Sequence, residues 1–203
     1  SSSFQFFDSP IKNIIHFDSV QYDDQIYIFG GLRSNSVASE KLWKFDTISN
    51  TWNELFPANS PEGRYGHTFV EYDDNIYLFG GRNKDKIFSN LLRYNIQTNT
   101  WQEIFAKDEP PPRYFHSASI ISHYMAIIGG KGNNDVIYSD LYLYDFESRN
   151  WIKPRISGIR IRPIYSQRTV SYHNWIFIIG GKNDKEYVDP FCIYFLPLKG
   201  YFS

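Results

Sequence analysis

Four glycine pairs recur along the chain at nearly equal intervals, and this spacing constrains the fold more than any other feature. The pairs are Gly30-Gly31, Gly80-Gly81, Gly129-Gly130 and Gly180-Gly181, so their first members lie 50, 49 and 51 residues apart. Each pair ends an apolar run, for example QIYIFGG and NIYLFGG. A fixed period of this length is typical of one supersecondary unit that is repeated, each copy needing neighbours to bury its faces.

The second repeat shows what the unit contains. The segments RYGHTFVEYDD and NIYLFGG predict two strands joined by an acidic turn, and LLRYNI and TWQEIF predict two more strands joined by a polar turn. Short strands separated by turn-forming residues predict an antiparallel meander. No segment of ten or more residues has an apolar period of 3.6 residues, so we expect an all-β fold without helices.

Large aromatic side chains recur 14 or 15 residues after the first glycine of a pair. Three of them are followed seven residues later by a tryptophan, and the resulting pairs are Phe45 with Trp52, Tyr94 with Trp101, and Tyr144 with Trp151. Twisted sheets packed side by side leave gaps that large rings can fill. We therefore expect these aromatic side chains to be structural rather than part of a ligand site.

The apolar strand, the glycine pair, the aromatic residue and the spaced tryptophan together resemble the kelch repeat. The resemblance covers residues 14–203, and it implies a single domain over residues 1–203 with the fold of a kelch-type β-propeller. In that fold each repeat forms about one blade of four antiparallel strands, so four blades are expected. The repeats span approximately residues 14–62, 63–112, 113–162 and 163–203.

Two arrangements of the four blades remain open. The fourth repeat lacks its last strand, and the segment 2–7 lies at the spacing of a last strand. This segment is therefore a candidate to complete the final blade and cover a sheet edge, giving a closed four-bladed ring. The alternative is an arc of a larger propeller, which the resemblance favours slightly because kelch propellers usually have more than four blades.

Composition excludes several classes of protein. The formal net charge of −1 gives no overall attraction to nucleic acid or to an anionic membrane. No apolar stretch approaches the roughly 20 residues of a membrane-spanning helix, and the single cysteine, Cys192, excludes an intrachain disulfide framework. Cys192 lies within the apolar run FCIYFL, which predicts a core position. We expect a cytoplasmic protein.

Catalytic chemistry has no clear signature in the sequence. His67 and His116 occupy the same slot of the repeat, which indicates a structural role, and the acidic pairs at 23–24 and 73–74 fit hairpin turns. No His, Cys, Asp or Glu cluster has metal-ligand spacing. We therefore expect no cofactor and no enzymatic activity. The alternative is a propeller enzyme, a metal-dependent oxidase or specifier type, with a site built from residues distant in sequence.

The resemblance implies a binding site at one end of the blades. In peptide-binding kelch propellers, the residue after each glycine pair and the arginine that starts each repeat face a common mouth. The first set is Leu32, Arg82, Lys131 and Lys182, and the second set is Arg64 and Arg113, with Ile14 and Ile164 as departures. Five of these eight positions are cationic. Tyr65, Tyr114 and Phe115 neighbour the arginines and are expected to supply apolar walls.

A basic mouth of this kind predicts an adaptor that binds an acidic or phosphorylated segment of a partner protein, because guanidinium groups form paired hydrogen bonds with carboxylates and phosphates. A second interpretation of Arg64 and Arg113 stays open, in which they brace adjacent blades through backbone carbonyl groups. For Arg82, Lys131 and Lys182 the corresponding alternative is a solvated loop charge.

Overall fold

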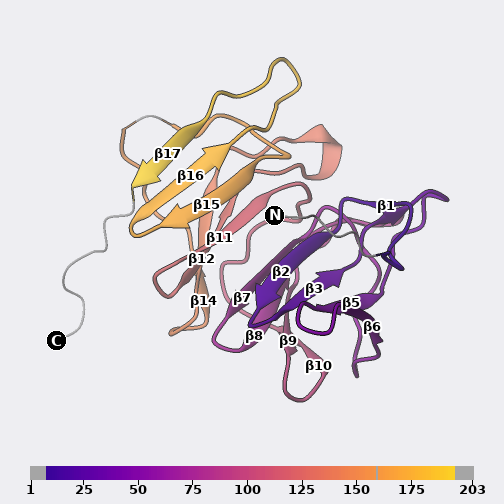
Figure 1. Ribbon diagram of the computed structural model, residues 1–203. Helices are drawn as coiled ribbons and strands as arrows, with labels where there is room; N and C mark the ends of the chain where they lie inside the picture. The colour runs from indigo at the N-terminus through magenta and orange to yellow at the C-terminus, as the bar shows by residue number, and fades with distance from the viewer. Residues whose placement is uncertain (1–7, 159, 195–203) are drawn as a thin grey trace, which may run out of the picture. The chain divides into compact units, whose positions relative to one another are not determined.

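The computed structural model describes residues 8–158 and 160–194, and within them the chain is built from β-strands, as the sequence predicts (Figure 1). The proposed closing strand at 2–7 lies outside the described residues. The one helix in the described part is a short 3-10 turn at Asn133–Asp135, and no helix there is long and apolar enough to cross a membrane. The chain divides into two compact units, residues 1–86 with 90–104 and residues 87–89 with 105–203.

The first unit, hereafter unit 1, contains two antiparallel sheets of four strands. Blade 1 has the strand order β2 (Asp18–Tyr22), β3 (Gln25–Phe29), β5 (Leu42–Asp46) and β6 (Thr51–Leu55). Blade 2 has the order β7 (Thr68–Tyr72), β8 (Asn75–Phe79), β9 (Leu91–Asn95) and β10 (Thr100–Ile104). The short strands β1 (Ile14–Ile15) and β4 (Leu32–Arg33) pair beside blade 1. Both sheets are the predicted meander.

The second unit, unit 2, contains blades 3 and 4. Blade 3 has the order β11 (Ser117–Ile121), β12 (Tyr124–Ile128), β13 (Leu141–Asp145) and β14 (Asn150–Ile152). Blade 4 has three strands within the described residues, β15 (Arg168–Tyr172), β16 (Trp175–Ile179) and β17 (Phe191–Tyr194). The chain therefore has the all-β fold and the four blades that the repeats predict.

The glycine pairs of blades 1 and 3 lie where the backbone of the following blade comes closest. In unit 1, Gly31 N donates a 2.8 Å hydrogen bond to Arg64 O of the next repeat, and a Cβ on Gly30 would lie 2.5 Å from the same oxygen. In unit 2, Gly130 N donates to Ile164 O, also at 2.8 Å. Gly30 has a φ of +72°, which glycine adopts without strain. The pair is therefore required both by backbone geometry and by the close approach of two blades.

Aromatic rings fill the interface between blades 1 and 2. Trp101, which is 1% exposed, lies 5.5 Å from Phe29 of blade 1 and 5.2 Å from Tyr94 of its own blade, measured between ring centroids. This contact confirms the structural role predicted for Trp101. Its counterpart in blade 1, Trp52, is only half-buried and packs at a tilt against Phe45, with ring centroids 4.8 Å apart.

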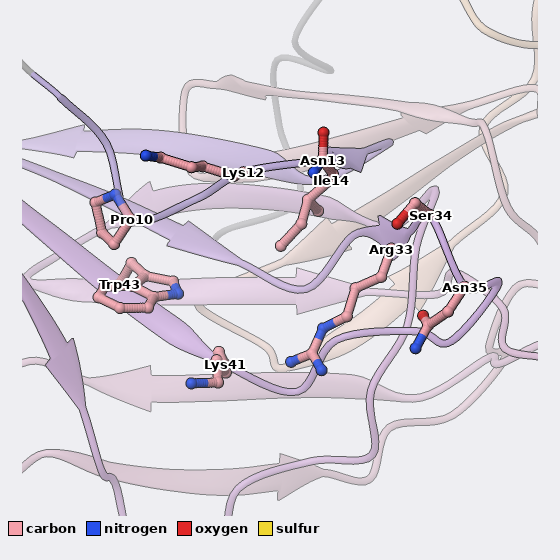
Figure 2. A pocket seen from close by; sticks show the side chains of 9 residues that line it. All are labelled: Pro10, Lys12, Asn13, Ile14, Arg33, Ser34, Asn35, Lys41 and Trp43. Carbon is pink, nitrogen blue, oxygen red and sulfur yellow. The ribbon is translucent and has the colours of Figure 1, made fainter.

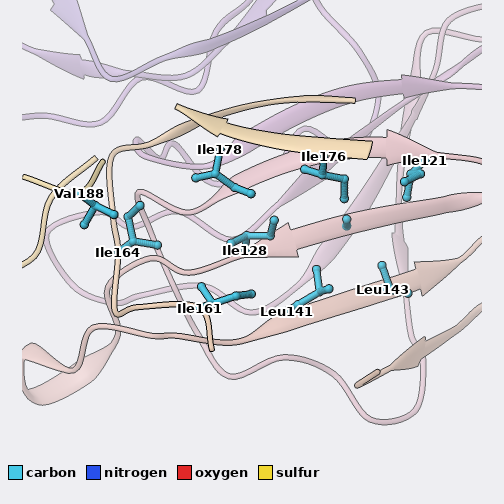
Figure 3. Close-up of a cluster of buried hydrophobic side chains, with 10 residues drawn as sticks. Ile121, Ile128, Leu141, Leu143, Ile161, Ile164, Ile176, Ile178 and Val188 are labelled. Atoms are coloured by element: carbon cyan, nitrogen blue, oxygen red, sulfur yellow. The ribbon is translucent and has the colours of Figure 1, made fainter. Parts of the chain in front are cut away.

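Aliphatic side chains fill the interface between blades 3 and 4 (Figure 3). The cluster consists of Ile121, Ala126, Ile128, Leu141, Leu143, Ile161, Ile164, Ile176, Ile178 and Val188. Cys192 is not part of it. The predicted core position of Cys192 is wrong, because this residue pairs with Phe177 on the face of blade 4 that points away from the cluster, and its side chain is exposed.

Candidate functional site

One end of each blade carries the residues predicted for the binding mouth, and a backbone pairing holds them there. Tyr65 and Arg82 exchange two backbone hydrogen bonds of 2.9 Å. The same exchange joins Tyr114 with Lys131 at 2.9 and 2.8 Å, and Tyr165 with Lys182 at 3.0 Å in both directions. In blade 1 the equivalent pair is Ile15 with Leu32. Each repeat therefore presents, side by side, the residue after the glycine pair and the second residue of the repeat.

In unit 2 this pairing gathers two cations at one aromatic ring. The Nζ of Lys131 lies 4.8 Å from the centroid of the Tyr165 ring, and the Nζ of Lys182 lies 5.6 Å from it. Lys182 is exposed, and Lys131 and Tyr165 are half-buried. Tyr165 is not among the predicted site residues, although its position after Ile164 matches that of Tyr65 after Arg64 and could have identified it.

The predicted aromatic wall of unit 2 is less accessible. Tyr114 is buried, and its ring packs against the half-buried Phe115 with centroids 4.9 Å apart. In unit 1 the guanidinium carbon of Arg82 lies 6.0 Å from the centroid of the Tyr65 ring, and both side chains are half-buried. Unit 1 therefore offers one cation beside a tyrosine, and unit 2 offers two.

Arg113 lies inside unit 2, with an exposed fraction of 0%. Its Nη1 and Nη2 donate to the two carboxylate oxygens of Asp140 at 2.6 and 3.0 Å, and Nη1 also donates to Gly129 O at 2.9 Å. The guanidinium carbon lies 4.2 Å from the centroid of the Tyr138 ring, and Nε donates to Pro111 O at 3.2 Å. These contacts tie the start of the repeat to the loop that follows the glycine pair.

Arg64 occupies the equivalent buried position in unit 1, where its partner is neutral. Its Nη1 donates to Asn90 Oδ1 at 2.8 Å and to Gly80 O at 3.2 Å, and its Nε donates to Glu62 O at 3.2 Å. Burial lowers the pKa of Arg64 to about 10. Both arginines thus brace their own blade through backbone carbonyl groups, rather than adjacent blades as in the second interpretation. The cations that remain at the surface of the predicted set are Arg82, Lys131 and Lys182.

Two histidines in the shared slot are also buried. Burial, together with the charge of nearby Arg64, lowers the pKa of His67 to about 3, so its imidazole is neutral at pH 7. His116 is 5% exposed. Blade 4 has Gln167 in this slot, where its Nε2 donates to Ile128 O at 2.8 Å and to Ser117 Oγ at 3.1 Å. These positions fit the structural role that their repetition indicates.

A pocket beside blade 1 adds cations that lie outside the predicted set (Figure 2). Arg33, Lys12 and Lys41 line it together with Trp43. The lysines already have acidic partners, since Lys41 Nζ lies 2.8 Å from Glu54 and Lys12 Nζ lies 3.3 Å from Asp8. The surface next to Leu32 is therefore mainly polar and basic.

Three possible metal ligands meet where two hairpin turns of blade 3 touch. His123 Nε2 lies 3.9 Å from Asp145 Oδ1 and 3.9 Å from Glu147 Oε2, and these ligand atoms all lie within 4.8 Å of one another. Spacing in the sequence could not reveal this group, because 22 residues separate His123 from Asp145 and the sheet register brings them together. Asp145 also accepts hydrogen bonds from Glu147 N and Ser148 Oγ, which stabilise its turn.

A comparison with known protein families identifies the chain. Residues 16–197 match the family model described as the KLHDC2/KLHL20/DRC7 Kelch-repeats domain. The match covers nearly the whole chain and agrees with the glycine pairs, the four-strand meanders and the buried Trp101 between two blades. The chain belongs to the kelch-repeat family, whose fold is the β-propeller.

Proposed function

We propose that this chain is an adaptor whose unit 2 binds an acidic or phosphorylated segment of a partner protein through Lys131, Lys182 and Tyr165. Kelch-repeat domains are commonly protein-interaction modules. The observation that carries the proposal is the pair of lysine ammonium groups within 4.8 and 5.6 Å of one tyrosine ring. In unit 1, Arg82 beside Tyr65 is proposed to contribute a similar but weaker contact.

The chemistry of this group suits a negatively charged side chain with an apolar stem. An ammonium group binds a carboxylate or phosphate as a point charge, while the ring face packs against methylene groups. Among the described residues, no Asp or Glu forms an ion pair with either lysine. The charge of the two lysines is therefore free of the acidic partners that neutralise Lys12 and Lys41.

Charge reversal tests the proposal. The probe is a fluorescein-labelled glutamate-rich nonapeptide with a central phosphoserine, and binding is measured by fluorescence anisotropy at low and high salt. We expect the Lys131→Glu/Lys182→Glu variant to bind at least about tenfold more weakly than the wild type, and wild-type binding to weaken with salt.

The control lies in the same loop as one of the two lysines. Lys185→Glu makes an equal change of charge at an exposed position three residues beyond Lys182, and we expect it to reduce binding by less than about twofold. A glutamine-rich peptide without phosphate should not bind. Equal binding of wild type and double variant, or equal effects of the double variant and the control, would contradict the proposed site.

A metal-dependent activity is the second candidate, favoured by the group His123, Asp145 and Glu147. Imidazole and carboxylate ligands suit divalent ions such as Zn²⁺ or Mn²⁺. Metal analysis of the purified protein decides between the candidates. A stoichiometric ion that is lost in His123→Ala, together with unchanged peptide binding in the lysine variant, would favour the second candidate.

A further inference from the structure

Two neighbouring turns of blade 3 place one imidazole beside two carboxylates. His123 lies in the turn between β11 and β12, and Asp145 and Glu147 lie at the turn between β13 and β14. The strand register pairs Tyr124 with Asp145. Phe146 N donates a 3.1 Å hydrogen bond to His123 O, which joins the two turns through their backbones. The sheet itself therefore brings these three side chains together.

A serine orients each of the two less exposed members of the group. Ser122 Oγ lies 3.2 Å from His123 Nδ1, so its oxygen can accept the imidazole proton there while Nε2 faces the carboxylates. Ser148 Oγ donates to Asp145 Oδ2 at 2.8 Å. Hydrogen-bonded neighbours of this kind fix the tautomer and the orientation of metal ligands.

Asp145 keeps room for a further ligand bond. Three donors reach its carboxylate among the described residues, which are Glu147 N, Ser148 N and Ser148 Oγ. A carboxylate has about four acceptor positions, so one of them stays open for an ion.

The other blades show that the repeat does not require this group. The corresponding positions, aligned by register and sequence, hold other residues in both blades of unit 1: Asp74, Asn95 and Gln97 in blade 2, and Asp24, Asp46 and Ile48 in blade 1. The turn of blade 2 is nevertheless capped, because Asn95 Oδ1 accepts a 2.8 Å hydrogen bond from Thr98 N. An amide therefore suffices for the turn, and of these three blades only blade 3 combines an imidazole with two carboxylates.

We propose that His123, Asp145 and Glu147 bind Zn²⁺, and that the ion links the two turns of blade 3 in a structural role. Zn²⁺ binds imidazole nitrogen and carboxylate oxygen at about 2.0–2.2 Å, so the ligand atoms of a tetrahedral site lie about 3.4 Å apart. His123 Nε2 lies 3.9 Å from Asp145 Oδ1 and 3.9 Å from Glu147 Oε2. Each separation must shorten by only about 0.5 Å, and the exposed Glu147 side chain can rotate to do so.

The chemistry of the three side chains selects the ion. Two carboxylates balance the charge of a divalent cation. The imidazole of His123 suits Zn²⁺, whereas Mg²⁺ and Ca²⁺ prefer sites made of oxygen ligands alone. Water completes the coordination of a zinc ion that has three protein ligands.

This site is separate from the proposed peptide site. β12 runs from the turn that contains His123 to the glycine pair that precedes Lys131, so the two sites lie at opposite ends of one strand. The inference goes beyond peptide binding, and it gives the group of the second candidate a role that requires no reaction. Loss of zinc binding should leave peptide binding unchanged, and Lys131→Glu/Lys182→Glu should leave zinc binding unchanged, so failure of one proposal can be told from failure of the other.

Calorimetric titration and thermal unfolding with ZnCl₂ test the site. We expect the wild type to bind one zinc ion. At a free zinc concentration about ten times the Kd, its Tm should rise by about 2–4 °C, because an ion that binds only the folded state stabilises it. MgCl₂ at the same concentration should give no rise. Asp145→Asn and Glu147→Gln introduce the residues of blade 2, and each should bind zinc at least about tenfold more weakly and lose most of the rise.

A histidine in the corresponding turn of blade 4 supplies the matched control. His173 is exposed in the turn between β15 and β16, and His173→Gln should keep the full zinc-dependent rise in Tm. Histidine side-chain NMR spectra locate the ion, since the signal that is absent in His123→Gln should be the one that zinc shifts. Circular dichroism without zinc checks that each variant is folded, and the exposed position of Glu147 makes Glu147→Gln the decisive variant.

Four results would overturn the proposal. They are a wild-type Tm that zinc does not raise, zinc binding that is unchanged in Glu147→Gln, an equal loss in His173→Gln, and a zinc-dependent shift of another histidine signal in place of that of His123.

Discussion

The cores of the two units have the same strand pattern but different chemistry. The interface between blades 1 and 2 is filled mainly with rings, including Phe29, Tyr94 and Trp101, whereas the corresponding interface of unit 2 is filled mainly with isoleucine and leucine. Both units bury an arginine and a histidine, which are Arg64 and His67 in unit 1 and Arg113 and His116 in unit 2. The link between glycine and carbonyl is nevertheless identical, since Gly31 N to Arg64 O and Gly130 N to Ile164 O both measure 2.8 Å. The backbone hydrogen bond between blades is therefore the same in both units, whereas the side chains packed around it differ between the units as a set.

The largest expected effect concerns the tryptophan ring that lies between the two blades of unit 1. Trp101→Ala removes the indole that packs on Phe29 and Tyr94, and we expect a loss of about 3–5 kcal/mol in the free energy of unfolding. Trp52→Ala in blade 1 is the matched control and should cost less than about 2 kcal/mol, because that ring is half-buried. Urea unfolding followed by circular dichroism measures both. Equal costs would contradict the role of Trp101 as the filler between blades.

The two buried arginines have different hydrogen-bond partners, and a substitution can give the arginine of one unit the type of partner found in the other unit. Asp140→Asn gives Arg113 the neutral amide that Asn90 gives Arg64, and we expect a loss of about 2 kcal/mol because a charge-assisted pair is replaced by a neutral hydrogen bond. Asn90→Asp is the reciprocal change and should stabilise unit 1 or leave it unchanged. If both changes destabilised the protein to the same degree, local packing rather than charge would determine how much this position contributes to stability.

Much of this fold is predictable from the sequence, because the glycine pairs, turn residues and strand patterns are local signals. The partners of Arg64 and Arg113 are not local, since Asn90 and Asp140 lie 26 and 27 residues further along the chain. A cation that starts a repeat therefore looks the same in the sequence whether it faces solvent or a buried carboxylate. The exposure of Cys192 was missed for a similar reason, since an apolar strand does not reveal whether a neighbouring sheet covers it.

The buried His67 in the shared slot predicts a pH dependence of stability for unit 1. The pKa of His67 is about 3 in the folded protein and near 6.5 when unfolded, so the unfolded state binds the proton first. The neutral imidazole of His67 therefore contributes fully to the free energy of unfolding above about pH 6.5. This contribution is lost as the pH falls toward 3, by at most about 1.4 kcal/mol per pH unit.

Blade 4 supplies the control for this effect. His67→Gln introduces the residue that blade 4 has in this slot, Gln167, which cannot titrate. The free energy of unfolding of the variant minus that of the wild type should therefore be about 2 kcal/mol larger at pH 5 than at pH 7. Urea titrations at the two pH values give the comparison. A difference between variant and wild type that does not change with pH would show that His67 does not couple proton binding to folding.

The smallest effect concerns a polar contact of unit 2 that unit 1 replaces with an apolar one. Ser119 Oγ donates to Thr169 Oγ1 at 2.6 Å, and Thr169 Oγ1 donates to Ala118 O at 3.2 Å, whereas register places Val20 and Phe69 at these two positions in unit 1. Thr169→Val alone should cost about 1 kcal/mol, because it leaves the buried Ser119 hydroxyl without its acceptor. Adding Ser119→Ala should recover most of that loss, since removing both partners of a buried hydrogen bond is nearly neutral. A double-mutant cycle measures the coupling, and strictly additive losses would show that the two hydroxyl groups act independently and that this contact is not exchangeable between the units.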